Sequence, residues 1–279
     1  MILPTATKIA LARWINRVVL VARAAGGAGT EAVVERAGIR WSLDLAEGID
    51  FAIWLLGAFE PATQRAYGGL LPSGGVAIDI GANIGAHTLP LAKAVGPGGR
   101  VLAVEPTALA YGKLCRTLAL NPALAERVTA VQAMLGAGGE DQVPPGIFAS
   151  WPLEPSADVH PRHLGVRVST AGARAVSLDA LAVEQGLKRI DLIKLDVDGY
   201  EFEVLQGAQA TLARFRPAIV FELAPYTLAE RGVEPEAPID LLRGLGYRFA
   251  GLDGRPCGGD GLKVPPVPTG SSVNLLAVP

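Results

Sequence analysis

The sequence of 279 residues has little cysteine and little charge, and each shortage excludes a class of protein. Its two cysteines, Cys115 and Cys257, provide neither a disulfide framework nor a zinc-binding spacing. Two reduced thiols are typical of a cytoplasmic protein. Only 19% of the residues are charged and 50% are hydrophobic, which excludes global disorder. A net charge of −2, without clustered Lys and Arg, gives no indication of a nucleic-acid partner.

Long uncharged runs are also missing from the apolar N-terminal stretch, residues 8–27. Four basic residues interrupt it: Lys8, Arg13, Arg17 and Arg23. Its longest uncharged run, Val18 to Ala22, is far too short to span a bilayer, and no signal-peptide layout is present. The stretch therefore predicts an amphipathic helix, which either docks on the body of the protein or makes a peripheral contact with a membrane surface.

Residues 1–70 are predicted to form a cap that precedes a main domain, residues 71–279. Residues 39–45 alternate between apolar and polar, as in a strand. Residues 48–60, GIDFAIWLLGAFE, have helical spacing, and the helix is expected to stop at Pro61.

The main domain alternates short apolar runs with helix-like stretches such as 86–96 and 108–121. Five runs predict buried strands: 76–80, 100–105, 128–135, 190–197 and 217–223. This rhythm predicts an α/β, Rossmann-like fold with a parallel sheet covered on both faces. Residues 247–254 and 272–279 have no helix between them and predict a hairpin at one edge. Residues 136–175, rich in Gly and Pro, are predicted to be an irregular insert over the active site.

The stretch AIDIGANIGAHTLPLAKAVG contains a glycine turn directly after the first strand of this domain. Gly81 and Gly85 allow a sharp turn close to a ligand at the carboxyl end of the sheet. A dinucleotide fingerprint has a middle glycine, which is missing here. Asp79 would repel a phosphate but suits a cation, and S-adenosylmethionine carries an ammonium and a sulfonium and has no phosphate. Glu105, at the end of the second strand, can accept hydrogen bonds from ribose hydroxyls, a role that NAD enzymes share.

Over about residues 36–250 the sequence resembles the FkbM-type family of S-adenosylmethionine-dependent methyltransferases. The resemblance rests on the glycine turn and on a second stretch, VSLDALAVEQGLKRIDLIKLDVDGYEFEVLQGA. The resemblance implies a class I methyltransferase fold, a seven-stranded sheet with the last strand antiparallel. It also implies methylation of hydroxyl groups, often on sugars, glycans or natural products. Asp79, Gly81, Asn83 and Gly85 would line the cofactor and Glu105 would hold its ribose. Many members have Glu at the position of Asp198, so the reach of this carboxylate differs here.

The motif KLDVDGYE supplies candidate catalytic groups. Lys194, Asp196 and Asp198 share one face of a strand, so Lys194 can pair with Asp196 in the cleft. Asp196 is expected to orient the acceptor or to contact the cofactor's ammonium, with a purely structural ion pair as the alternative. Carboxylates here would also suit Mg²⁺, but we expect no metal.

Histidine is the side chain best matched to accept a proton near neutral pH. His160 and His163, in the insert, are candidate general bases. The remaining candidates are expected to contact the acceptor: His87, Asp198, Glu222 and Tyr226.

The sequence thus predicts an O-methyltransferase that uses S-adenosylmethionine and a small-molecule or glycan acceptor. Two alternatives remain open at this stage. One is an NAD(P)-dependent Rossmann-fold oxidoreductase, disfavoured by the missing glycine. The other is a non-catalytic module that keeps the cofactor fold and binds a partner. The acceptor and the oligomeric state are not indicated.

Overall fold

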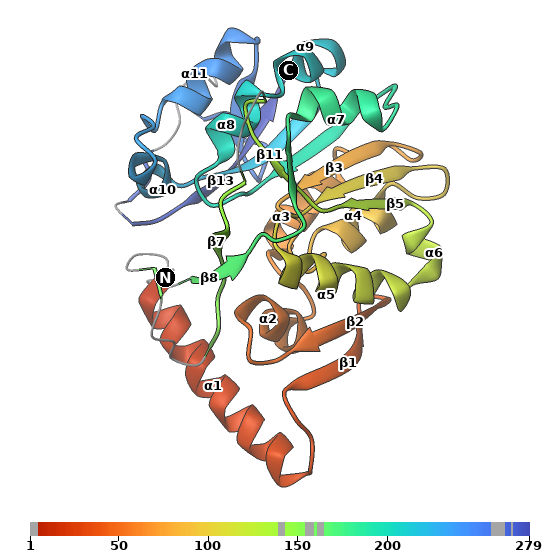
Figure 1. The fold of residues 1–279 in the computed structure, drawn as a ribbon, viewed down its shortest axis with the longest axis vertical. Coiled ribbons are helices and arrows are strands. Elements are labelled where there is room, and N and C mark those ends of the chain that lie inside the picture. The colour runs from red at the N-terminus through yellow and green to blue at the C-terminus, as the bar shows by residue number, and fades with distance from the viewer. Residues whose placement is uncertain (1–4, 139–142, 154–158, 161–164, 258–265, 269) are drawn as a thin grey trace.

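A seven-stranded sheet forms the centre of the protein (Figure 1). The computed structural model describes residues 5–138, 143–153, 159–160, 165–257, 266–268 and 270–279. In sequence order the strands are β3 (Val76–Ile80), β4 (Arg100–Val104), β5 (Val128–Val131), β10 (Leu192–Leu195), β11 (Ala218–Leu223), β12 (Arg248–Gly251) and β13 (Val273–Val278). Their spatial order is β12-β13-β11-β10-β3-β4-β5.

The final strand runs against its neighbours. β13 pairs antiparallel with both β11 and β12, whereas β11, β10, β3, β4 and β5 pair in parallel. The predicted hairpin of 247–254 and 272–279 is confirmed as β12 and β13, and the last strand is antiparallel as expected. β13 lies between β12 and β11, so of these two hairpin strands β12 is the one at an edge of the sheet.

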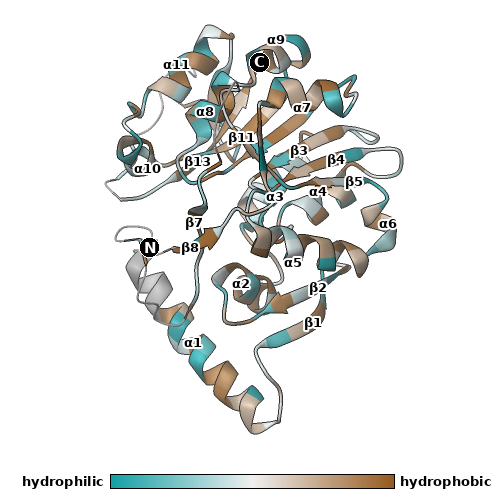
Figure 2. Ribbon diagram, viewed as in Figure 1, coloured by the Kyte–Doolittle hydropathy of each residue, from teal (hydrophilic) through white to brown (hydrophobic). Residues whose placement is uncertain are grey.

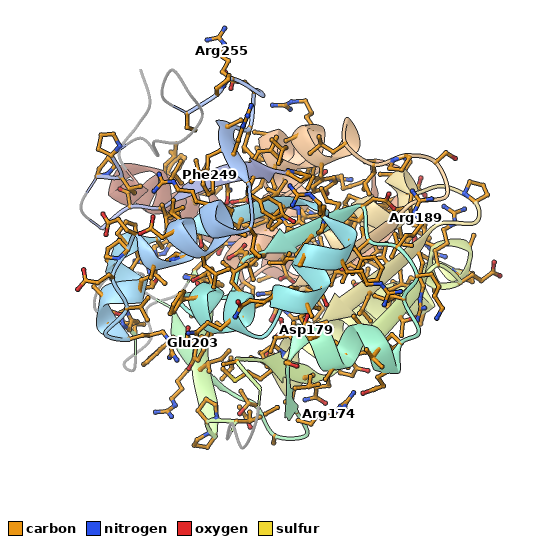
Figure 3. All side chains as sticks on the ribbon, turned by 90° about the horizontal axis from the view of Figure 1, so that it is seen from above. Arg174, Asp179, Arg189, Glu203, Phe249 and Arg255 are labelled. Atoms are coloured by element: carbon orange, nitrogen blue, oxygen red, sulfur yellow. The ribbon has the colours of Figure 1, made fainter. Side chains whose placement is uncertain are left out.

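Helices cover both faces of the sheet because successive residues of each strand point to opposite sides. Ile78 packs in a buried cluster with residues of α7 (Leu178–Glu184), α8 (Glu201–Gln206), α9 (Gln209–Phe215) and α11 (Ala237–Gly244). Its neighbour Ala77 packs on the other side with α3 (Pro61–Gly68) and α4 (Thr88–Ala94). Figure 2 shows hydrophobic strands between these layers. Seen from above in Figure 3, the labelled Arg174, Arg189 and Arg255 project at the perimeter.

The N-terminal segment forms α1 (Thr5–Ala25), β1 (Glu31–Arg36), β2 (Ile39–Asp44) and α2 (Gly48–Leu56). The predicted helix and the strand at 39–45 are confirmed, whereas β1 was not expected. The predicted stop of the second helix at Pro61 is wrong: α2 ends at Leu56, where Gly57 adopts φ +86°, and Pro61 begins α3. Trp41 and Phe51 pack in one buried cluster with Ile84 of the glycine loop and Leu114 of α5 (Ala108–Ala119), so this segment supports the loop. The domain boundary near residue 70 stays a prediction.

Two sequence interpretations of the insert region are corrected. The run 128–135 is not one strand, because β5 ends at Val131 and β6 (Ala133–Leu135) pairs with β9 (Arg174–Val176) in a separate sheet. The insert 136–175 is not irregular throughout, since β7 (Gly146–Ser150) and β8 (Val166–Ser169) form an antiparallel pair. The connecting helices α6 (Pro122–Ala125) and α10 (Pro225–Glu230) complete the described elements. None of the helices in the described part of the chain has the length and apolar character needed to cross a membrane.

Candidate active site

The glycine loop is held against the end of β10. Gly81 adopts φ +77°, and a Cβ placed there would lie 1.8 Å from the carbonyl oxygen of Asp196. Gly85 adopts φ +92°, where a Cβ would press on the side chains of Leu89 and Leu114. Both positions therefore require glycine, as the sequence predicted. At Gly81 the reason is the close approach of the Asp196 backbone, and at Gly85 it is packing beneath the loop.

Asp79 lies beneath the loop. Its side chain is fully buried, its Oδ2 accepts a 2.6 Å hydrogen bond from Thr88 Oγ1, and its Oδ1 lies 4.0 Å from Lys194 Nζ. Asp79 is not among the described residues that line the cavity above the loop. Its direct contact with a cofactor stays a prediction, and its observed contacts position the loop and Lys194.

A cavity of about 590 Å³ opens over the carboxyl ends of β3, β4, β10 and β11. Gly81, Asn83 and Glu105 line one part of it. Its apolar wall comes from α2, from the segment that follows it and from the insert: Phe51, Leu55, Leu56, Phe59, Ile147, Trp151 and Leu153. The insert thus contributes to the cavity, as do α2 and the segment that follows it.

Glu105 is almost fully buried and already bonded within the protein. Its Oε2 accepts from the backbone N–H of Asn83 at 2.9 Å, and its Oε1 accepts from the N–H and the hydroxyl of Thr107. Burial raises the pKa of Glu105, which these three hydrogen bonds partly offset. Since each carboxylate oxygen accepts about two hydrogen bonds, only Oε2 has room for a further donor. A ribose hydroxyl fits that single place.

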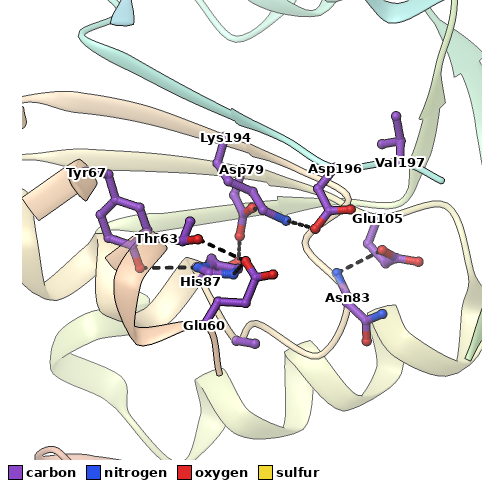
Figure 4. Close-up of polar contacts among 12 residues, drawn as sticks. Glu60, Thr63, Tyr67, Asp79, Asn83, His87, Glu105, Lys194, Asp196 and Val197 are labelled. Atoms are coloured by element: carbon purple, nitrogen blue, oxygen red, sulfur yellow. Dashed lines mark hydrogen bonds and ion pairs between the residues drawn. The ribbon is translucent and has the colours of Figure 1, made fainter. Parts of the chain in front are cut away.

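Lys194 and Asp196 form the predicted ion pair, with 2.9 Å between Nζ and Oδ2 (Figure 4). Burial alone would lower the pKa of Lys194, but Asp196, Asp79 and Glu60 together raise it above its ordinary value. Burial alone would raise the pKa of Asp196, but Lys194 and His87 hold it below its ordinary value. Both groups are therefore charged at neutral pH, which makes Asp196 a weak base and a good partner for a cation or a hydroxyl.

Three carboxylates meet at the ends of β10 and β11. Oxygens of Asp196, Asp198 and Glu222 lie within 4.8 Å of one another, a grouping that could also hold a cation. Burial and the charge of Asp196 raise the pKa values of Asp198 and Glu222 well above their ordinary range. Both side chains line the cavity, as does Tyr226, whose pKa burial raises to about 12. The absence of a metal requirement stays a prediction.

Glu60 and His87 form a second polar pair, of which the sequence indicated only His87. His87 Nε2 lies 3.5 Å from Glu60 Oε2, and its Nδ1 lies 3.4 Å from the Tyr67 hydroxyl (Figure 4). Thr63 and Asn274 donate hydrogen bonds to the Glu60 carboxylate. Burial would raise the pKa of Glu60, but His87 and Lys194 hold it below its ordinary value. Glu60 and His87 both line the cavity.

His160, in the insert, does not join this pair. His160 Nε2 lies 3.0 Å from Glu230 Oε2, its ring contacts Phe148, and it is not among the described residues that line the cavity. His163 lies outside the described residues. A catalytic role for either histidine stays a prediction.

Backbone strain gathers at this cavity. Five described residues other than glycine have positive φ, and three of them line the cavity: Glu60, Asn83 and Asp198. Such conformations cost about 1–3 kcal/mol each and persist where the surroundings impose them, often at functional sites. One feature of the sequence could have marked Glu60 as a candidate site residue. It directly precedes a proline, Pro61, just as the predicted ribose ligand Glu105 directly precedes Pro106.

Comparison with known proteins identifies the family. A model of the methyltransferase FkbM domain matches residues 79–249. The chain belongs to this family. The FkbM resemblance is thereby confirmed, and the seven-stranded sheet described above is the class I methyltransferase fold that it implied. Residues 79–249 form a methyltransferase domain, for which S-adenosylmethionine is the cofactor. The oxidoreductase alternative is wrong.

Relatives of this FkbM-family chain include methyltransferase sdnD of Sordaria araneosa, 36% identical over 49% of this chain and 61% of the relative. The AMB antimetabolite synthetase AmbE of Pseudomonas aeruginosa is 29% identical over 65% of this chain and 10% of that protein. The chain therefore spans less than two-thirds of either relative. A solved structure of a methyltransferase FkbM from Methylobacillus flagellatus KT has 18% identity and a TM-score of 0.46, over 79% of this chain and 48% of that one.

The residues present fit the cofactor. Glu105 Oε2 has one open acceptor place, the backbone turn at Gly81 exposes the loop to the cavity, and ionised Asp196 suits an ammonium. Gly81, Asn83, Glu105 and Asp196 would therefore hold the cofactor.

Proposed function

We propose that this methyltransferase methylates a hydroxyl oxygen on a sugar, a glycan or a natural product with a sizeable apolar part. One observation carries the proposal: the pairs Glu60–His87 and Lys194–Asp196 both line a cavity that is also lined by seven large apolar side chains. The name of one relative, an antimetabolite synthetase, accords with a natural-product acceptor.

When bound, the cofactor supplies an electrophilic methyl group on a sulfonium. The protein has to align the acceptor oxygen at about 3–3.5 Å from that carbon and to accept the hydroxyl proton. We assign the alignment to Asp196, because Lys194 keeps it ionised and so able to accept a hydrogen bond from the hydroxyl.

Proton acceptance is assigned to Nε2 of His87, in the tautomer whose Nδ1 carries the hydrogen and donates it to the Tyr67 oxygen. An imidazole exchanges protons near neutral pH, and a neighbouring carboxylate stabilises the imidazolium that results. Glu60 is that carboxylate, and Thr63 and Asn274 orient it. Tyr67 approaches the other ring nitrogen and fixes the plane of the imidazole.

The test is mass spectrometry of extracts incubated with the protein and a deuterated-methyl cofactor. We expect a product labelled on oxygen, and a fall in kcat of about a hundredfold in His87→Asn and in Glu60→Gln. Glu184→Gln, at an exposed carboxylate outside the cavity, is the control and should retain wild-type turnover. His160→Ala tests the alternative base. Label on nitrogen or carbon would overturn the O-methyl assignment, and full activity of His87→Asn would remove His87 as the base. Tight cofactor binding without any labelled product would favour a non-catalytic module.

A further inference from the structure

The outward face of α1 is apolar, the reverse of an ordinary surface helix. Its inner face packs on the protein through Ile15, Val19 and Leu20, and Asn16 donates a 2.6 Å hydrogen bond to the Leu45 carbonyl. The solvent face of such a helix is normally polar. Here it carries four large apolar side chains, which we call the outer stripe: Leu11, Trp14, Val18 and Val21, exposed by 48%, 66%, 53% and 65%.

The spacing of three, four and three residues aligns the outer stripe along one side of the helix over about 15 Å. α1 runs along the outer margin of the molecule (Figure 1). Contiguous exposed apolar side chains of this kind mark a surface for another molecule.

The charge of α1 indicates what that molecule is. The helix contains four basic residues and no acid, although the whole chain has a net charge of −2. Arg17 is exposed beside the stripe, whereas Arg23 is bonded to the carbonyls of Gly29 and Glu31. A tryptophan and aliphatic residues beside an exposed arginine, on a helix without acids, fit a helix that lies in the interface of an anionic membrane.

A second copy of the chain fits less well. Two stripes face to face would bring two acid-free, basic helices together. Even at about 250 Å² for each side chain, four side chains exposed by half to two-thirds fall short of the roughly 800 Å² per partner of a stable dimer.

We propose that α1 binds an anionic lipid surface through the outer stripe. Ala12 and Arg13 of the same helix line the cavity together with Leu55 and Leu56, which are 43% and 73% exposed. The helix that would dock thus also forms part of the cavity wall.

Flotation of the full chain with vesicles of phosphatidylcholine, alone or mixed with phosphatidylglycerol, tests the proposal. We expect binding to the mixed vesicles that weakens with salt, and a loss of roughly tenfold or more in the Trp14→Ser/Val21→Ser variant. The control Leu109→Ser/Val183→Ser removes two side chains exposed by 49% and 78% on other helices and should bind as wild type.

Circular dichroism melting establishes that both double variants fold. The proposal would be overturned if the wild-type chain did not float with the mixed vesicles. It would also be overturned if the two double variants bound the mixed vesicles equally well. A third result would also overturn it: the wild-type chain forms a concentration-dependent dimer and does not bind vesicles, and only Trp14→Ser/Val21→Ser abolishes that dimer.

Discussion

Lys194 and Asp196 form a 2.9 Å ion pair at the end of the central strand, and the same ammonium lies 4.0 Å from the buried Asp79. One cation thus neutralises a carboxylate below the glycine loop and another that lines the cavity. A change at Lys194 is therefore expected to affect both the stability of the folded sheet and the charge at the cavity.

Replacing Lys194 with Met should reduce the free energy of unfolding by about 3 kcal/mol, because Asp79 would remain buried without its counter-charge. Urea unfolding measures this. Arg189→Met, which breaks a pair with Asp191 that involves an exposed arginine, is the control and should cost clearly less, because solvent screens an exposed pair. Equal losses in the two variants would show that Lys194 does not compensate Asp79.

Comparing Gly81→Ala with Gly98→Ala distinguishes the destabilisation caused by a steric clash from the destabilisation caused by backbone strain alone. Both residues have positive φ, +77° and +79°, but a Cβ at Gly98 meets nothing within 4 Å. Gly98→Ala should therefore cost about 1–2 kcal/mol in unfolding free energy. Gly81→Ala should cost clearly more and also weaken cofactor binding in calorimetry, because the loop must move off the Asp196 carbonyl. If the two variants match in both measurements, the loop is not held by that contact.

Glu105→Gln should weaken cofactor binding about tenfold or more, since hydrogen bonds to a charged group contribute about 1.5–3 kcal/mol. Calorimetry should give the same loss for S-adenosylmethionine and S-adenosylhomocysteine, which share the ribose. Glu184→Gln changes an exposed carboxylate that pairs with Arg174 and should bind as wild type. A loss confined to one of the two ligands would contradict ribose binding by Glu105.

The ionisation of Glu201 is expected to make the free energy of unfolding depend on pH. Burial is the main cause that raises its pKa from 4.5 to about 7, and its Oε2 is buried without a hydrogen-bond partner. Below pH 4.5 the carboxyl is protonated in both the folded and the unfolded protein, so it has no effect on stability there. As pH rises from 4.5 to about 7 the unfolded chain ionises first, and the free energy of unfolding falls by up to about 1.4 kcal/mol per pH unit.

Urea unfolding at several pH values should therefore show a shallower decline for Glu201→Gln than for the wild type. Glu234→Gln, at an exposed position, should follow the wild-type curve. Parallel curves for wild type and Glu201→Gln would mean that Glu201 ionises normally in the folded protein.

The cofactor side of this site could be predicted from sequence because its signals are local. Gly81 and Glu105 each follow a buried apolar run directly, and strand alternation alone brings Lys194 beside Asp196. Each of these inferences needs only a few consecutive residues.

The acceptor side depends on contacts between distant segments. Glu60 reaches His87 across 27 residues, through a positive φ at Glu60 and the packing of α3 beside α4, and neither follows from residue type. The pairing of β6 with β9 likewise joins segments about forty residues apart, so 128–135 was predicted as one strand.

The position of β13 between β11 and β12 also sets an order of assembly. Among the described strands β12 pairs only with β13, so it has no neighbour until residues 273–278 have been synthesised. At about 5–20 residues per second, the wait on the ribosome lasts seconds. During that interval β11, which carries Glu222, has a bare edge, while β3, β4 and β10 already have their partners. The part of the sheet that carries the glycine loop, Glu105 and Asp196 can thus form before β11 gains its second neighbour.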